Sequence, residues 1–101
     1  MFHLFTKIDS ISTFELEKKL NSQIQLIDVR TPLEFQRGHI KNAKNVPLNT
    51  IANYVPTANK TVYVICQSGA RSKLAAKKLK HQGYDAINVQ GGMNTWRGKI
   101  V

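Results

Sequence analysis

The single cysteine of this 101-residue chain, Cys66, lies where a thiol becomes chemically useful. It follows the apolar run Val62-Tyr63-Val64-Ile65, which is typical of a buried strand, and a helical pattern begins near Ala70. The amino end of a helix presents unpaired N–H groups and a partial positive charge. Both favour the thiolate, which is the nucleophilic form of cysteine. We therefore predict a reactive or anion-binding cysteine, rather than one that is buried as a small apolar side chain.

The residues that follow Cys66 strengthen this interpretation. Gly69 allows a tight turn in which backbone N–H groups point inward and form an anion-binding nest. Arg71 adds a permanent positive charge and a planar set of donors that suits oxyanions. The predicted anion-binding loop comprises Gln67, Ser68, Gly69, Ala70, Arg71 and Ser72.

Three blocks of sequence carry a family resemblance. Cys66-Gln-Ser-Gly-Ala-Arg71 resembles the six-residue active-site loop of rhodanese (sulfurtransferase) domains. The segments 26–35 and 38–47 are similar to the N-terminal signature of that family, and 91–96 resembles the C-terminal one. The blocks occur in the family's order and spacing, so the resemblance covers the chain from Ile11 onward.

The resemblance implies a fold and a domain organisation. We expect residues 1–101 to form one rhodanese-like domain, with residues 1–10 as its lead-in and first strand. The expected α/β fold has a mainly parallel central sheet with helices on both faces. The alternation of strand and helix patterns along the chain independently favours such a sheet.

The resemblance also implies a reaction. A rhodanese-like sulfurtransferase moves a sulfane sulfur from thiosulfate, or from another persulfide donor, to an acceptor such as cyanide or a thiol. The intermediate would be a persulfide on Cys66. No cofactor is expected, and the histidines are not spaced as metal ligands, so no metal is expected either.

Four further residues are candidates for the anion pocket. Arg30 follows a predicted strand, at the end where open α/β sheets place their sites, and rhodanese-like domains often turn an arginine here toward the pocket. Asp28 is expected to form an internal ion pair, and His39 matches a structural histidine of the family. The other pocket candidates are Arg37, Gly92 and Met93.

Two other functions compete with this one. Cysteine-dependent phosphatases and arsenate reductases also place a Cys-to-Arg loop at a helix N-terminus, but with five intervening residues, whereas this chain has four. Ile65 also stands where such enzymes commonly have histidine. The second alternative is a non-enzymatic persulfide carrier or binding module of the same fold, although binding modules typically have the cysteine replaced.

The sequence also predicts the helices and strands that position these residues. Ser12 with Glu15, and Thr31 with Glu34, have the form of capping boxes, and Gly38 would end the second helix. The other expected strands cover 24–29, 45–47 and 84–89, and a helical turn is expected within 48–54. The first helix should end at Leu20, with Phe14 and Leu20 as core anchors, and the helix over 70–81 should place Leu74, Ala75 and Leu79 on the sheet. A terminal helix is expected over 93–99, with Trp96 in the core.

Composition bears on partners and location. The net charge of +9 comes from 15 Lys and Arg against 6 Asp and Glu, and such a field attracts anionic substrates. An acidic protein partner could dock on Lys73, Lys77 and Lys80, although simple solvation of that stripe is the plainer interpretation. No nucleic-acid-binding module, membrane span or signal peptide is evident. We therefore expect a cytoplasmic protein, and the high like charge favours a monomer.

Overall fold

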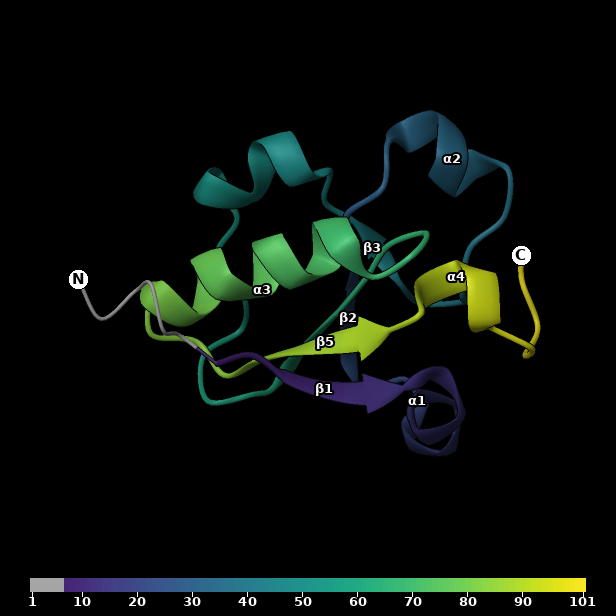
Figure 1. The fold of residues 1–101 in the computed structure, drawn as a ribbon, viewed down its shortest axis with the longest axis horizontal. Coiled ribbons are helices and arrows are strands. Elements are labelled where there is room, and N and C mark those ends of the chain that lie inside the picture. Colours follow the sequence, from purple (N-terminus) through teal and green to yellow (C-terminus); the bar gives the residue numbers. More distant parts are fainter. Residues whose placement is uncertain (1–6) are drawn as a thin grey trace.

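The computed structural model describes residues 7–101 and has an α/β fold (Figure 1). Its sheet has five strands in the order β1-β5-β4-β2-β3, and every neighbouring pair is parallel. The strands are β1 (Asp9–Ser12), β2 (Gln25–Asp28), β3 (Lys44–Asn45), β4 (Val62–Ile65) and β5 (Ala86–Gln90). Because all strands run the same way, the segments that follow β2, β4 and β5 meet at one edge.

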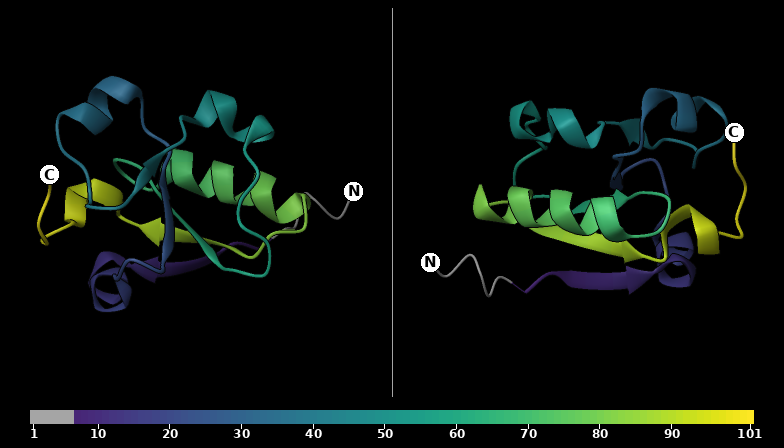
Figure 2. Two further views of the ribbon diagram at one scale, coloured as in Figure 1. Left: turned by 180° about the vertical axis from the view of Figure 1, so that it is seen from behind. Right: turned by 45° about the horizontal axis from the view of Figure 1, so that its top comes forward.

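The helices cover both faces of the sheet, as expected (Figure 2). On one face, α3 (Ala70–His81) and the 3₁₀-helix η2 (Leu48–Asn53) pack over Val62 and Val64. On the other face, α1 (Thr13–Lys19) and α4 (Gly92–Thr95) pack against Ile65. Successive side chains of β4 thus enter opposite cores, which is the two-residue period of a strand. The central position of β4 explains why its sequence is apolar throughout.

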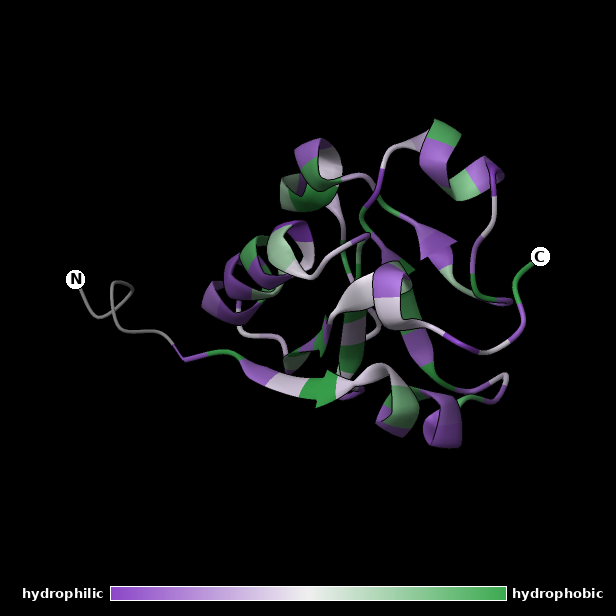
Figure 3. Ribbon diagram, turned by 45° about the vertical axis from the view of Figure 1, so that its right-hand side comes forward, coloured by the Kyte–Doolittle hydropathy of each residue, from purple (hydrophilic) through white to green (hydrophobic). Residues whose placement is uncertain are grey.

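Local capping signals define where the helices begin. Ser12 and Glu15 form a complete capping box at α1. Thr31 and Glu34 form the second one at α2 (Pro32–Gln36), and Gly38 follows its C-cap residue. The bands of hydrophobic and hydrophilic residues along the helices in Figure 3 fit elements with one face on a sheet and the other in solvent. None of the helices described is long and apolar enough to cross a membrane.

Two predicted core contacts are wrong. Phe14 is 66% exposed, and the Lys18 ammonium lies 4.3 Å from the centre of its ring. Leu16 is the fully buried residue of α1 instead. Leu74 of α3 is 47% exposed, whereas Ala75, Ala76 and Leu79 are buried as one face. In both helices, the position of the sheet decides which of two neighbouring apolar residues faces the core.

The boundaries of the elements also differ from the sequence predictions. The terminal helix is only four residues long, because Trp96 adopts an extended conformation and Gly98 packs beneath its indole ring. Trp96 still packs partly buried against the core next to Met93. The first strand is confined to Asp9–Ser12 among the described residues, and the earlier part of the predicted lead-in, residues 1–6, lies outside them.

Candidate active site

The loop between β4 and α3 encloses the sulfur of Cys66. Gly69 takes φ +104°, in the left-handed region that favours glycine, and this bend turns its N–H toward the sulfur. The Gly69 nitrogen lies 3.0 Å from Cys66 Sγ, and the Ser72 hydroxyl lies 3.3 Å from it. Cys66 is 0% exposed, so the thiol lies inside the loop rather than on its surface.

Burial and hydrogen bonding act on this thiol in opposite directions. Burial raises the pKa of Cys66, since it penalises the charged form. The Ser72 hydroxyl and the backbone N–H groups of Ser72, Gly69 and Ser68 together outweigh it, and the net pKa of Cys66 is lowered. The loop is therefore built to favour a thiolate, as the strand–loop–helix pattern predicts.

Helix α4, near the C-terminal end of the chain, supports the loop through its backbone. The Met93 N–H donates to the Cys66 carbonyl, and the Asn94 N–H donates to the Gln67 carbonyl, both at 2.9 Å. A Cβ atom at Gly92 would overlap the Cys66 carbonyl and lie 2.7 Å from the Gln67 carbonyl oxygen. Gly92 therefore adjoins the loop through its backbone. The Met93 side chain packs against the core that contains Ile65.

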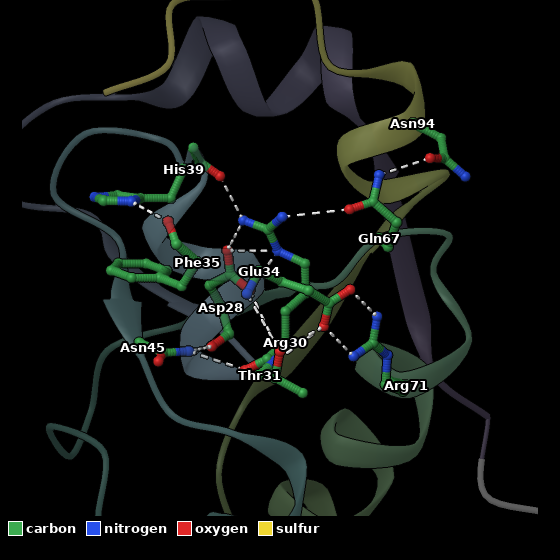
Figure 4. Close-up of polar contacts among 11 residues, drawn as sticks. Asp28, Arg30, Thr31, Glu34, Phe35, His39, Asn45, Gln67, Arg71 and Asn94 are labelled. Carbon is green, nitrogen blue, oxygen red and sulfur yellow. Dashed lines mark hydrogen bonds and ion pairs between the residues drawn. The ribbon is translucent and has the colours of Figure 1, made fainter.

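Arg30 is buried and touches both an acid and the loop (Figure 4). Its Nη2 lies 2.8 Å from Asp28 Oδ2, which confirms the expected ion pair of Asp28, and also donates to the Gly38 carbonyl at 2.8 Å. Its Nη1 donates to Gln67 Oε1 at 3.3 Å. The amide of Gln67 also donates to Asn94 Oδ1 at 2.7 Å, so this loop side chain is held from two sides.

Arg71 does not turn inward as a free cation. Its Nη1 and Nη2 donate to the two carboxylate oxygens of Glu34 at 2.8 and 3.0 Å (Figure 4). The hydrogen bond from Arg71 is the main reason that the pKa of Glu34 falls to about 2, and the Thr31 backbone N–H contributes further. Sequence reasoning assigned Glu34 to the cap alone. No local signal reveals this pair, because its members are 37 residues apart.

The remaining candidates lie at the surface or have structural contacts. Ser68 and Ala70 are exposed on the outside of the loop. Arg37 is exposed at the end of α2, and no hydrogen bond or ion pair within residues 7–101 joins its side chain to the loop. The His39 ring is stacked on Phe35, and its Nδ1 lies 2.7 Å from the Phe35 carbonyl. These contacts agree with a structural histidine.

Two asparagines near the loop were not identified from the sequence. Asn94 of α4 holds Gln67, as described above, and Asn88 of β5 lies 2.5 Å from the Ser72 hydroxyl. Their positions depend on which strands are neighbours. Among residues 7–101, no cluster of His, Cys, Asp and Glu side chains could hold a metal ion.

The comparisons with known proteins agree with the fold. The crystal structure of a rhodanese-like domain protein from Staphylococcus aureus superposes with a TM-score of 0.83 at 38% identity, covering 91% of this chain and 94% of that one. A putative sulfurtransferase of Bacillus subtilis, YtwF, is 38% identical over 92% of this chain and 94% of its own length. The thiosulfate sulfurtransferase PspE of Escherichia coli is 39% identical over 66% of this chain and 68% of its own.

Other curated relatives are longer than the region they share with this chain. A putative sulfur carrier protein of Bacillus subtilis, YrkF, is 33% identical over 89% of this chain, which spans 50% of that protein. The chain likewise spans 63% of an uncharacterized protein from the same organism that is 46% identical. Residues 12–99 match the family described as the rhodanese-like domain. With this match across most of its length, the chain belongs to the rhodanese-like domain family.

Proposed function

We propose that this protein is a sulfurtransferase that carries a sulfane sulfur as a persulfide on Cys66. The observation that carries the proposal is the environment of Cys66 Sγ, which receives the Gly69 N–H at 3.0 Å and lies 3.3 Å from the Ser72 hydroxyl at the start of α3. These donors favour the thiolate, and they remain available to negative charge on the transferred sulfur. The sulfurtransferases among the relatives support the same chemistry.

The first half-reaction loads the sulfur. The Cys66 thiolate attacks the outer sulfur of thiosulfate and forms a new S–S bond, while the S–S bond of thiosulfate breaks. Sulfite leaves with that electron pair. In the second half-reaction, cyanide or a thiolate attacks the outer sulfur of the persulfide. The Cys66–sulfur bond breaks, its electron pair returns to Sγ, and the thiolate is regenerated.

The charged side chains have different proposed tasks. Arg71 is paired with Glu34, so we assign it to shaping the loop and moderating its charge rather than to gripping the donor. Arg30 is also paired, but its Nη1 faces Gln67 of the loop, from which it could move to an oxygen of an anionic donor. Since Cys66 is fully covered, side chains of the loop must shift when the donor reaches the sulfur.

One alternative has an observation of its own in its favour. A putative sulfur carrier is among the relatives, so this chain could receive sulfur only from a protein persulfide and show little turnover with thiosulfate. The phosphatase alternative is not favoured, because the loop has four residues between Cys66 and Arg71 and the arginine is paired with Glu34.

The test is the intact mass of the protein after incubation with thiosulfate, with Cys66→Ser as the control. We expect a gain of one sulfur atom that cyanide removes and that the control lacks. Loading by polysulfide but not by thiosulfate would indicate a different sulfur donor. If both fail but a protein persulfide loads Cys66, the carrier function is supported instead. If none of these donors modifies Cys66, the proposed function is refuted.

A further inference from the structure

The side chain of Asn88, a residue of β5, contacts the loop that follows Cys66. Its side chain is only 5% exposed, and its Oδ1 lies 2.5 Å from the Ser72 hydroxyl oxygen. Its Nδ2 faces the Gly69 carbonyl at 3.4 Å, which keeps Oδ1 turned toward Ser72. Ser72 is itself 0% exposed and lies 3.3 Å from Cys66 Sγ. The proposed reaction gives Asn88 no role so far.

The Ser72 hydroxyl has two acceptors within reach and a single proton. A serine hydroxyl donates one hydrogen bond at a time, so donation to Asn88 Oδ1 and donation to Cys66 Sγ exclude each other. The shorter distance belongs to Asn88. A thiolate is a much better acceptor than a thiol, because hydrogen bonds to charged groups are stronger than neutral ones. The direction of the Ser72 proton must therefore depend on the state of the sulfur.

We propose that Asn88 is a positioning residue for the nucleophile. It accepts the hydrogen bond of the Ser72 hydroxyl whenever Cys66 is uncharged, and the hydroxyl turns to donate to Sγ when the thiolate forms. This inference rests on the proposed function. In the persulfide, the negative charge moves to the outer sulfur, and Ser72 turns back to Asn88. When the acceptor attacks, charge returns to Sγ and the hydroxyl turns toward it, which stabilises the leaving thiolate. Asn88 thus competes with the thiolate for one hydrogen bond.

The charged groups around the loop do not explain this competition. On the β2 side, Asp28 and Arg30 neutralise each other, and Arg71 of α3 is paired with Glu34 of α2. Lys73 of α3 is exposed. The nearby side chains of β5 and α4, which include Asn88 and Asn94, are uncharged. A change at Asn88 therefore alters a hydrogen bond to the serine and leaves the charges of the site unchanged.

The experiment measures the rate at which iodoacetamide alkylates Cys66 as a function of pH. Asn88→Leu has nearly the same shape but lacks the competing acceptor, so Ser72 donates to sulfur alone. We expect the pKa of Cys66 to fall and alkylation below that pKa to become about three- to tenfold faster, the effect of one ordinary hydrogen bond. Ser72→Ala should slow alkylation under the same conditions.

The combination of the two substitutions decides between the proposal and a structural role. If Asn88 acts through Ser72, Asn88→Leu has no effect on the pH profile in a Ser72→Ala background. If it acts by releasing the Gly69 carbonyl and loosening the loop, the same effect persists there, and the proposal is overturned. An unchanged or raised pKa in Asn88→Leu alone also overturns it.

Two precautions keep the result interpretable. Should Asn88→Leu fail to fold, as judged by its thermal transition, Asn88→Val also lacks the acceptor and suits a strand. Alkylation needs no sulfur donor, so this measurement is independent of persulfide formation. A protein that shows the Asn88 effect but never gains sulfur would refute the proposed function while leaving the competition for the serine proton intact.

Discussion

Replacing Gly92 with alanine tests how closely α4 packs against the loop that follows Cys66. The added Cβ would lie 2.7 Å from the Gln67 carbonyl oxygen and even closer to the Cys66 carbonyl, and backbone carbonyls cannot move away cheaply. Relief requires α4 to withdraw from the loop. That withdrawal breaks the hydrogen bonds from Met93 to Cys66 and from Asn94 to Gln67, each 2.9 Å long.

The expected cost follows from these contacts. Each of the two backbone hydrogen bonds contributes about 1 kcal/mol to the free energy of unfolding. Alanine at φ +56° adds about 1 kcal/mol of backbone strain. We therefore expect Gly92→Ala to lower the free energy of unfolding by about 3 kcal/mol, which leaves a typical small domain folded but clearly weakened.

Gly83→Ala is the matched control. Gly83 has a similar left-handed backbone, with φ +97°, but a Cβ there would meet no atom within 4 Å. It should show the strain alone, about 1 kcal/mol. Urea unfolding and thermal melting measure the difference, which corresponds to roughly 10 °C in melting temperature. If Gly92→Ala is no more destabilising than Gly83→Ala, the close approach of α4 to the loop is not the reason that glycine is needed at position 92.

Two further predictions concern the ion pairs. The Glu34 carboxyl has its pKa lowered from 4.5 to about 2, so its contribution to stability is present above pH 4.5 and is lost as the pH falls toward 2. In unfolding experiments at different pH, Glu34→Gln should reduce the loss of unfolding free energy below pH 4.5. Glu15→Gln, at the capping box that has no arginine partner, is the control and should reduce it less. Equal effects of the two substitutions would argue against the pair of Glu34 and Arg71. Asp28→Asn leaves the Arg30 charge buried without its partner and should cost about 3–5 kcal/mol in urea unfolding, so a loss below about 1 kcal/mol would contradict it.

The sequence alone was enough to predict the elements with strong local signals. The capping boxes at Ser12 and Thr31 start helices where predicted, because a cap depends on residues three positions apart. The strand before Cys66 and the helix over 70–81 are also confirmed, because an apolar run and a helical pattern are features of neighbouring residues. The cysteine loop could therefore be located without tertiary information.

Only the tertiary structure decided which side chains meet around that loop. The partner of Arg71 is Glu34 because α2 lies beside the start of α3, and the local sequence carries no signal for that neighbour. Asn88 reaches Ser72 because β5 pairs with β4 in a register that sets Val64 opposite Asn88. The exposure of Leu74 is likewise set by the direction in which the sheet lies. Caps and strand patterns involve residues close in sequence, whereas these contacts depend on strand order and helix packing, which the whole chain determines together.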